Sequence, residues 1–210
     1  MNKKWLKYIV LIAVAGLLAY NSVYFKKLDA KKEVAEMDMK PAEFAQKFWA
    51  TKFSASLDSA VEINRFVKML QENPKDVFEK YSKTQGIGNV SYFLVKAEGV
   101  ITDVNEGNVI VLARSGAAEL PVKLNTGIYF GNAVRDVTGL ISMGDFSNTM
   151  DFNSVSSELN KILRTQVVLP FKTKAVKGTT VQFVGCAEIN REQINTVDIQ
   201  LLPVRINIKQ

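Results

Sequence analysis

The sequence predicts an α+β protein with an N-terminal transmembrane helix, a short α-helical prefix and an OB-like five-stranded β-barrel. Three observations predict it: an uncharged stretch near the amino terminus, helical periodicity over residues 41–81, and strand patterns from residue 90 onward. One more helix falls between the third and fourth predicted strands. The predicted parts are a signal anchor with its juxtamembrane linker (1–32), the α-helical prefix (33–86) and the OB-like barrel domain (87–210).

The uncharged stretch covers residues 8–25 and has basic residues on both sides (Lys3, Lys4, Lys7, Lys26, Lys27). This pattern is typical of a signal peptide or a membrane anchor, and about 20 apolar residues span a bilayer. No Ala-x-Ala-like pair follows Gly16, which favours an uncleaved anchor over residues 5–25 above a cleaved peptide. A short amino terminus before a long globular segment predicts a single-pass inner-membrane protein whose C-terminal domain is periplasmic.

The net charge of +6 belongs to the membrane flank. The first 32 positions hold seven of the 27 basic residues and only one of the 21 acidic residues. Residues 33–210 therefore carry 20 basic and 20 acidic residues and are formally neutral. We therefore expect no nucleic-acid partner, because a phosphate backbone requires a basic face. The chain has no histidine, which excludes the usual Ser/His and Cys/His pairs and the common zinc ligand sets. We expect no catalytic residue, metal or cofactor, and Cys186 in its apolar run is predicted to be a buried hydrophobic residue.

The helical prefix is predicted to hold three helices. Pro41 suits the first turn of one helix, Asp58 is the expected N-cap of the second, and Asn73 with Pro74 ends that helix and begins the third. The apolar stripes of the three helices are Phe44, Phe48 and Trp49; Val61, Ile63, Phe66, Val67 and Leu70; and Val77, Phe78 and Tyr81. Such stripes favour core packing, with a partner groove as the alternative.

The strand region begins with a long run over residues 90–104, in which Gly99 is expected at a bulge or tight bend. Strands over 109–113 and 120–124 complete a three-stranded meander, and strands over 180–189 and 196–208 close the sequence, with Pro203 at an edge or bulge. The intervening helix is predicted to start at the cap Asp151, with a hydrophobic staple of Met150 on Val155 and a buried stripe (Phe152, Val155, Leu159, Ile162, Leu163). This order is that of an OB-type Greek-key barrel.

The connection between the third strand and this helix carries two spaced motifs. The first holds Gly127, Gly131, Ala133, Arg135 and Asp136; the second holds Asp145, Phe146, Asn148, Asp151 and Phe152, and the following helix reaches Leu159 and Asn160. On these residues the sequence resembles a family of uncharacterised bacterial proteins, the predicted periplasmic lipoproteins (domain of unknown function 2291). The resemblance extends more weakly over residues 35–208. Family members typically carry a lipidated cysteine after the apolar run, whereas residues 17–22 here contain none.

The resemblance implies an accessory role at the envelope, associated with sugar uptake systems of the ATP-binding-cassette type, and no catalytic activity. We therefore predict a membrane-anchored extracytoplasmic accessory or binding protein, with the membrane and transporter subunits or another envelope protein as partners. The alternative is a binding protein for a saccharide or another small ligand, with a cleft around residues 127–151.

The candidate ligand-binding residues of that cleft are Arg135, Asp136, Asp145, Asn148 and Asp151, with Gly127 and Gly131 as backbone turns. An arginine and several carboxylates can bind the hydroxyls of a sugar. The same residue types also brace long connections: Arg135 would then pair with a carboxylate and Asp151 would cap its helix. A glycosidase carboxylate pair is not favoured, because nothing in the sequence fixes its separation.

Overall fold

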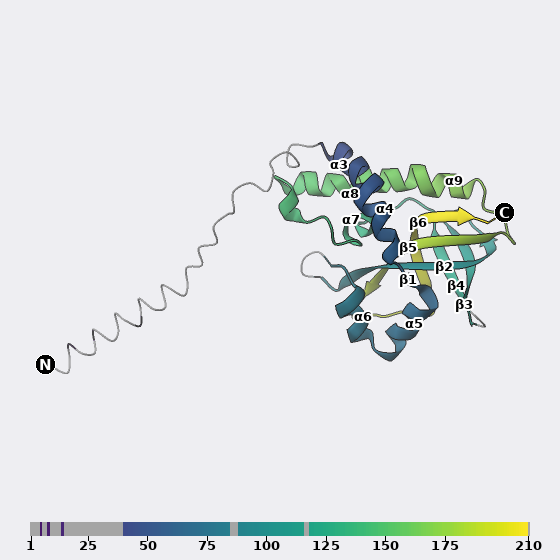
Figure 1. Ribbon diagram of the computed structural model, residues 1–210, viewed down its shortest axis with the longest axis horizontal. Coiled ribbons are helices and arrows are strands. Elements are labelled where there is room, and N and C mark those ends of the chain that lie inside the picture. The colour runs from purple at the N-terminus through teal and green to yellow at the C-terminus, as the bar shows by residue number, and fades with distance from the viewer. Residues whose placement is uncertain are drawn as a thin grey trace. The chain divides into compact units, whose positions relative to one another are not determined.

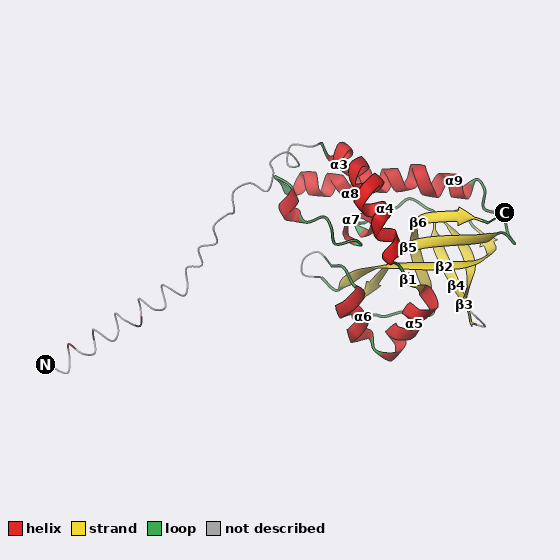
Figure 2. Ribbon diagram, viewed as in Figure 1, coloured by secondary structure: helices red, strands yellow, loops and turns green. Residues whose placement is uncertain are grey.

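The computed structural model describes residues 5, 8, 14, 40–84, 88–115 and 118–209. The predicted anchor over residues 5–25 lies almost entirely outside the described residues. Within them, no helix combines the length and the apolar character needed to cross a bilayer. The described residues from 40 to 209 belong to one compact unit, a mixed α+β fold with a six-stranded sheet (Figures 1 and 2).

The sheet contains the five predicted long strands and one short strand. They are β1 (Val61–Glu62), β2 (Val90–Val104), β3 (Asn108–Ser115), β4 (Ala118–Asn125), β5 (Thr180–Asn190) and β6 (Ile199–Ile208). Their order is β1-β2-β3-β4-β6-β5, and β5 also pairs with β2, so the pairings of the five long strands form a ring. The meander β2-β3-β4 is antiparallel, as predicted, and β4 pairs with β6 in parallel.

Strand β2 passes between two partners at Gly99. This residue pairs with Val181 of β5 on one side and with Ala113 of β3 on the other. A Cβ atom added to Gly99 would lie 2.8 Å from the Cα of Ala113 and would overlap the carbonyl oxygen of Leu112. Glycine is therefore required for the close approach of two backbones, while the register shift of β2 comes later, between Ile101 and Asp103.

Strand β6 is shorter than predicted. It begins at Ile199 because the side-chain oxygen of Asn195 accepts the backbone N–H groups of Val197 and Asp198, at 2.9 and 3.0 Å, and thereby holds a turn. Of the edge or bulge expected at Pro203, the bulge is confirmed. Gly185 pairs with Pro203 and Val184 with Arg205, so the register of β5 and β6 shifts there by one residue.

The helical prefix contains more segments than predicted. It runs through α3 (Pro41–Phe48), the π-helical η1 (Trp49–Phe53), α4 (Ser54–Ser56), the 3₁₀ segment η2 (Leu57–Ser59), β1, α5 (Ile63–Glu72) and α6 (Pro74–Tyr81). The starts of α3 and α6 at prolines are confirmed, and the side chain of Asn73 caps α6. The expectation that Asp58 caps the second helix was wrong. Because β1 intervenes, Glu62 caps α5 by accepting the N–H of Arg65 at 2.9 Å.

The connection between β4 and β5 contains the predicted helix. Its segments are α7 (Ala133–Asp136), the 3₁₀ segment η3 (Met143–Asp145), α8 (Thr149–Leu163), the π-helical η4 (Arg164–Val168) and α9 (Leu169–Lys172). The N-cap of α8 is Asn148, not Asp151 as predicted. The expected staple is not formed either, because Met150 is 73% exposed; Phe146 packs on Phe152 instead, with ring centroids 5.6 Å apart.

Two apolar cores hold these elements together. In the first, Phe66 of α5 and Phe78 of α6 lie against Phe93 of β2, with centroid distances of 5.0 and 5.4 Å. Residues of the predicted prefix and of the predicted barrel domain thus share one core. The second core packs α3 and α8 on β5 and β6 and contains Cys186, whose burial was predicted. Most of the predicted apolar stripes are likewise buried, as expected for core packing.

Candidate functional site

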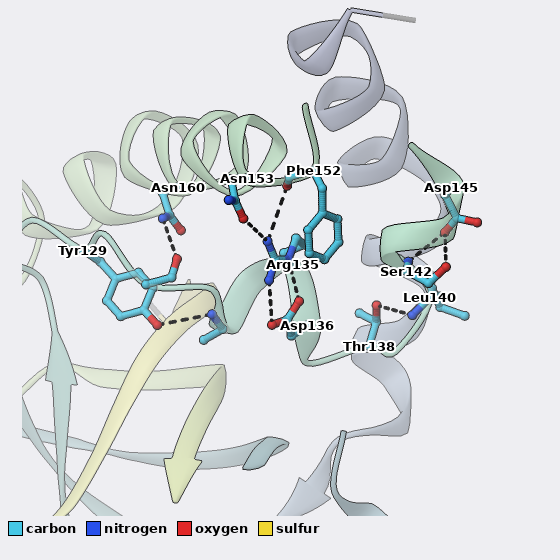
Figure 3. Close-up of polar contacts among 12 residues, drawn as sticks. Tyr129, Arg135, Asp136, Thr138, Leu140, Ser142, Asp145, Phe152, Asn153 and Asn160 are labelled. Carbon is cyan, nitrogen blue, oxygen red and sulfur yellow. Dashed lines mark hydrogen bonds and ion pairs between the residues drawn. The ribbon is translucent and has the colours of Figure 1, made fainter. Parts of the chain in front are cut away.

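Arg135 and Asp136, the centre of the predicted ligand cleft, form a buried ion pair (Figure 3). Both lie on α7 and are 4% and 3% exposed. The guanidinium meets the carboxylate with two contacts, Nε to Oδ1 at 2.6 Å and NH2 to Oδ2 at 3.0 Å. This bidentate geometry uses both carboxylate oxygens of Asp136 within the chain.

The remaining contacts of Arg135 reach the first turns of α8. Its NH1 group donates to the carbonyl oxygen of Phe152 at 3.4 Å and to Oδ1 of Asn153 at 3.3 Å. The guanidinium carbon lies 3.7 Å from the centroid of the Phe152 ring. Arg135 therefore joins α7 to α8, which is the bracing geometry that the sequence offered as the alternative to a ligand contact.

The other three candidate side chains hold local turns. Asp145 accepts the backbone N–H of Ser142 at 2.7 Å and its hydroxyl at 3.1 Å. Asn148 accepts the N–H of Asp151 at 2.8 Å and donates to the carboxylate of Asp151 at 2.7 Å. None of the five candidates lines the cavity of about 420 Å³ that is described below, or any of three further cavities among the described residues. Ligand binding by these side chains stays a prediction, while each of them already has a structural role.

The two predicted turn glycines differ in what they allow. Gly127 donates its N–H to the carbonyl oxygen of Gly107 at 3.0 Å, which ties the linker to the β2–β3 turn. Gly131 accepts a hydrogen bond from the side chain of Asn160 at 2.9 Å, and a Cβ there would overlap the ring of Tyr129 (Figure 3). Gly131 therefore leaves room for Tyr129 to fold back toward the sheet.

A cavity of about 420 Å³ lies where β4 and β5 end and β6 begins. Residues from α5, β4, the following linker, β5, the β5–β6 loop and β6 line it. Its polar lining residues are Asn125, Tyr129, Glu188, Asn190, Gln193, Asn195, Asp198 and Gln200. Only the density of amide and carboxylate side chains over residues 188–200 could have pointed to it from the sequence.

Three asparagines of this cavity are fixed in the same way. The Oδ1 atom of Asn125 accepts the N–H of Gly127 at 3.0 Å, and that of Asn190 accepts the N–H of Glu192 at 2.9 Å. Asn195 holds its turn by the same kind of bond. Among the described residues, the three amide nitrogens have no hydrogen-bond partner. The loops thus orient three side-chain N–H₂ groups that can donate to a ligand.

Glu188 and Tyr129 add an acceptor and a neutral hydroxyl. The hydroxyl of Tyr129 donates to Oε2 of Glu188 at 3.1 Å and accepts the N–H of Ala133 at 3.2 Å. Burial, and then the nearby charge of Glu188, raise the pKa of Tyr129 well above its ordinary value. The hydroxyl therefore stays protonated at neutral pH, and Glu188 keeps a second oxygen for a ligand.

Tyr92 lies opposite Glu188 on the neighbouring strand and gives a pH prediction. Burial first, and then the charges of Glu188 and Asp136, raise the pKa of Tyr92 to about 12. The folded protein then holds a proton that the unfolded chain releases near its usual pKa of about 10. The free energy of unfolding should fall as the pH rises through that interval. Urea unfolding at a series of alkaline pH values measures this. Tyr92→Phe should lessen the fall, and the remainder comes from Tyr129, whose pKa is also raised. An unchanged slope would contradict the assignment.

The cavity suits a neutral ligand that both donates and accepts hydrogen bonds. Its amides supply donors and Glu188 supplies an acceptor, while the carboxylate of Glu188, which has no cationic partner among the described residues, opposes an anion. Asp198 is paired with Lys123 at 2.8 Å, and that hydrogen bond lowers the pKa of Asp198. Within the described ranges, no group of three or more His, Cys, Asp or Glu side chains is arranged to hold a metal ion.

Comparison with known proteins agrees with this fold. A family described as "Predicted periplasmic lipoprotein (DUF2291)" matches residues 13–207 of the chain. The crystal structure of an OB-fold protein from Thermotoga maritima MSB8 is similar, with a TM-score of 0.72 and 24% sequence identity over 81% of this chain and 99% of that chain. No curated protein matches the sequence. The similarity to the solved structure shows the OB-type fold that the sequence predicted.

Proposed function

The chain belongs to the family of predicted periplasmic lipoproteins, and from this premise we propose that it is a non-enzymatic binding module held at the periplasmic face of the inner membrane. Residues 5–25 serve as its membrane anchor, in place of the lipidated cysteine that the family typically carries. The OB-like barrel presents the cavity beside Glu188 to the periplasm. Its ligand is a neutral, polyhydroxylated small molecule, such as a saccharide.

The observation that carries this proposal is the set of three oriented amides. Asn125, Asn190 and Asn195 each use Oδ1 to hold a turn and leave the N–H₂ group unbonded among the described residues. Donors that are already fixed lose little conformational entropy when a ligand binds. Hydroxyl groups can accept from these amides and donate to Glu188 at the same time.

The charge of the cavity favours a saccharide over the nucleic acids that other OB folds bind. Such folds bind oligonucleotides and oligosaccharides, so the fold alone selects neither. Asp198 is neutralised by Lys123, and Glu188 has no cationic partner among the described residues, so the cavity is anionic. Phosphate groups would be repelled, whereas uncharged hydroxyls would not.

Asn190→Asp tests the proposal. The substitution keeps the oxygen that holds the turn and replaces the donor by a carboxylate oxygen. Binding of any sugar that the native protein accepts should weaken at least about tenfold, or by about 1.4 kcal/mol. Titration calorimetry with D-glucose, D-galactose, D-ribose and maltotriose, on the full chain in detergent, measures the change.

The matched control is Asn73→Asp, because Asn73 also accepts a backbone N–H through Oδ1 but lies at the start of α6 and not in the cavity. It should leave sugar binding unchanged. If no neutral sugar binds, or if Asn190→Asp binds as well as the native protein, the cavity is not a saccharide site. A sugar phosphate binding more tightly than its parent sugar would also oppose the proposal.

An accessory role beside a sugar transporter is compatible with this site and rests on the family resemblance alone. Such a module would deliver or sense the transported ligand at the membrane. Co-purification of transporter subunits with the native chain from its own membranes would support this role, and their absence would favour a free-standing binder.

A further inference from the structure

Beyond Leu201, the edge of β6 that faces away from β5 has no neighbouring strand among the described residues. Strand β6 pairs with β4 only over Ile199–Leu201, whereas its pairing with β5 continues to Ile208. The N–H of Lys209 donates to the carbonyl oxygen of Thr180 at 2.9 Å, and such bonds alternate along an antiparallel pair. The backbone groups of Arg205 and Asn207 therefore face β5, while those of Ile206 and Ile208 point the other way. No strand of the described chain meets them.

A groove of about 650 Å³ runs along this unpaired edge. The π-helical η1 lines it with Trp49 and Phe53, and α9 lines it with Phe171. The π-helical η4 lies near β6 and adds Val167 (Figure 1). Both π-helical segments of the described chain thus border the same groove. π-helical turns are rare and recur at functional sites. The presence of both segments at this groove therefore favours a binding site there.

The charges of the groove favour a ligand that carries carboxylates. Lys174 and Arg205 line it, and no acidic residue does. Arg205 is paired with the exposed Asp58 at 3.2 Å, but Lys174 has no ion-pair partner in the described part of the chain. A second copy, added edge to edge about a two-fold axis, would bring the same cations together. A segment that carries carboxylates would not meet this repulsion.

We propose that this groove binds an extended peptide segment of a partner protein, which adds to β6 as a further strand. The backbone of the peptide pairs with Ile206 and Ile208, its apolar side chains lie against the partly exposed Trp49 and Val167, and an acidic residue meets Lys174. This is strand addition to an exposed sheet edge, in which main-chain bonds give affinity and side-chain contacts give specificity. The groove shares no lining residue with the cavity at Asn190, so the two sites are separate.

The test uses a labelled peptide, acetyl-Val-Thr-Val-Thr-Val-Glu-Glu, and fluorescence anisotropy with the full chain in detergent. Saturable binding is expected. The same peptide with an N-methyl group on every backbone amide has no N–H to donate at either edge and should bind at least about tenfold more weakly. Replacing both glutamates of the peptide by lysine should weaken binding to a similar extent. Both comparisons change the peptide and keep the native protein, so their outcome does not depend on whether a protein variant folds.

Ile206→Pro is the matching protein variant. It removes an N–H that faces the groove and keeps the bonds of Arg205 and Asn207 to β5, so an edge strand tolerates it. Peptide binding should fall at least about tenfold while sugar binding at Asn190 is unchanged. Equal binding of the N-methylated peptide, no binding of the parent peptide, or a dimer of the chain that Ile206→Pro abolishes would each overturn the proposal.

Discussion

Arg135→Ala should lower the free energy of unfolding by about 3–5 kcal/mol, because it leaves the carboxylate of Asp136 buried without its partner. The native guanidinium makes two contacts with that carboxylate and lies over the Phe152 ring, with both charged residues almost fully buried. Removal of Arg135 therefore also loosens the attachment of α7 to α8. Urea unfolding followed by circular dichroism measures the loss, and the expected change is a lower midpoint.

Two further variants separate a buried pair from a surface pair. Arg205→Ala breaks the exposed ion pair with Asp58 and should cost no more than about 1 kcal/mol. Arg135→Met combined with Asp136→Leu removes both charges and should recover much of the stability that Arg135→Ala loses. If Arg135→Ala cost no more than Arg205→Ala, the bracing role would be wrong, and a ligand role for Arg135 would regain support.

Local signals predicted much of the fold. The turn between Asn73 and Pro74, the long strand through Gly99 and the bulge at Pro203 each depend on the conformational limits of one or two residues. The cap predicted at Asp58 failed for a tertiary reason, because β1, which pairs with β2, separates Asp58 from the start of α5. Asp58 is a good capping residue by type, yet it pairs with Arg205, which lies 147 positions away in the sequence.

The candidate site was harder to predict than the fold. Arg135 and Asp136 have the residue types of a polar ligand site, and only their burial shows that each satisfies the other. The cavity beside Glu188 collects side chains from residues as distant as Phe66 and Leu202. Its asparagines look like ordinary turn residues in the sequence, because Oδ1 does hold turns. Only the assembled fold brings these asparagines, from β4, β5 and the β5–β6 loop, to one cavity.

The second large effect on stability is expected at Gly99, where β2 pairs with both β3 and β5. Gly99→Ala should destabilise the protein by about 3 kcal/mol or more, because the added methyl group meets backbone atoms of β3 that cannot rotate away. The nearest of these are the carbonyl oxygen of Leu112 and the Cα of Ala113, on the strand that pairs with β2 at this point. Relief requires β3 to move from β2, and β2 is also paired with β5 at Gly99.

Gly107→Ala is the matched control, since a Cβ at Gly107, in the turn between β2 and β3, would meet no atom within 4 Å. Its effect on the free energy of unfolding should stay within about 0.5 kcal/mol. The difference between the two variants isolates the close approach of β2 and β3 from the general cost of replacing a glycine. Equal stability of the two variants would mean that β2 and β3 separate easily, and that the ring of strand pairings is not the rigid frame on which the cavity beside Glu188 depends.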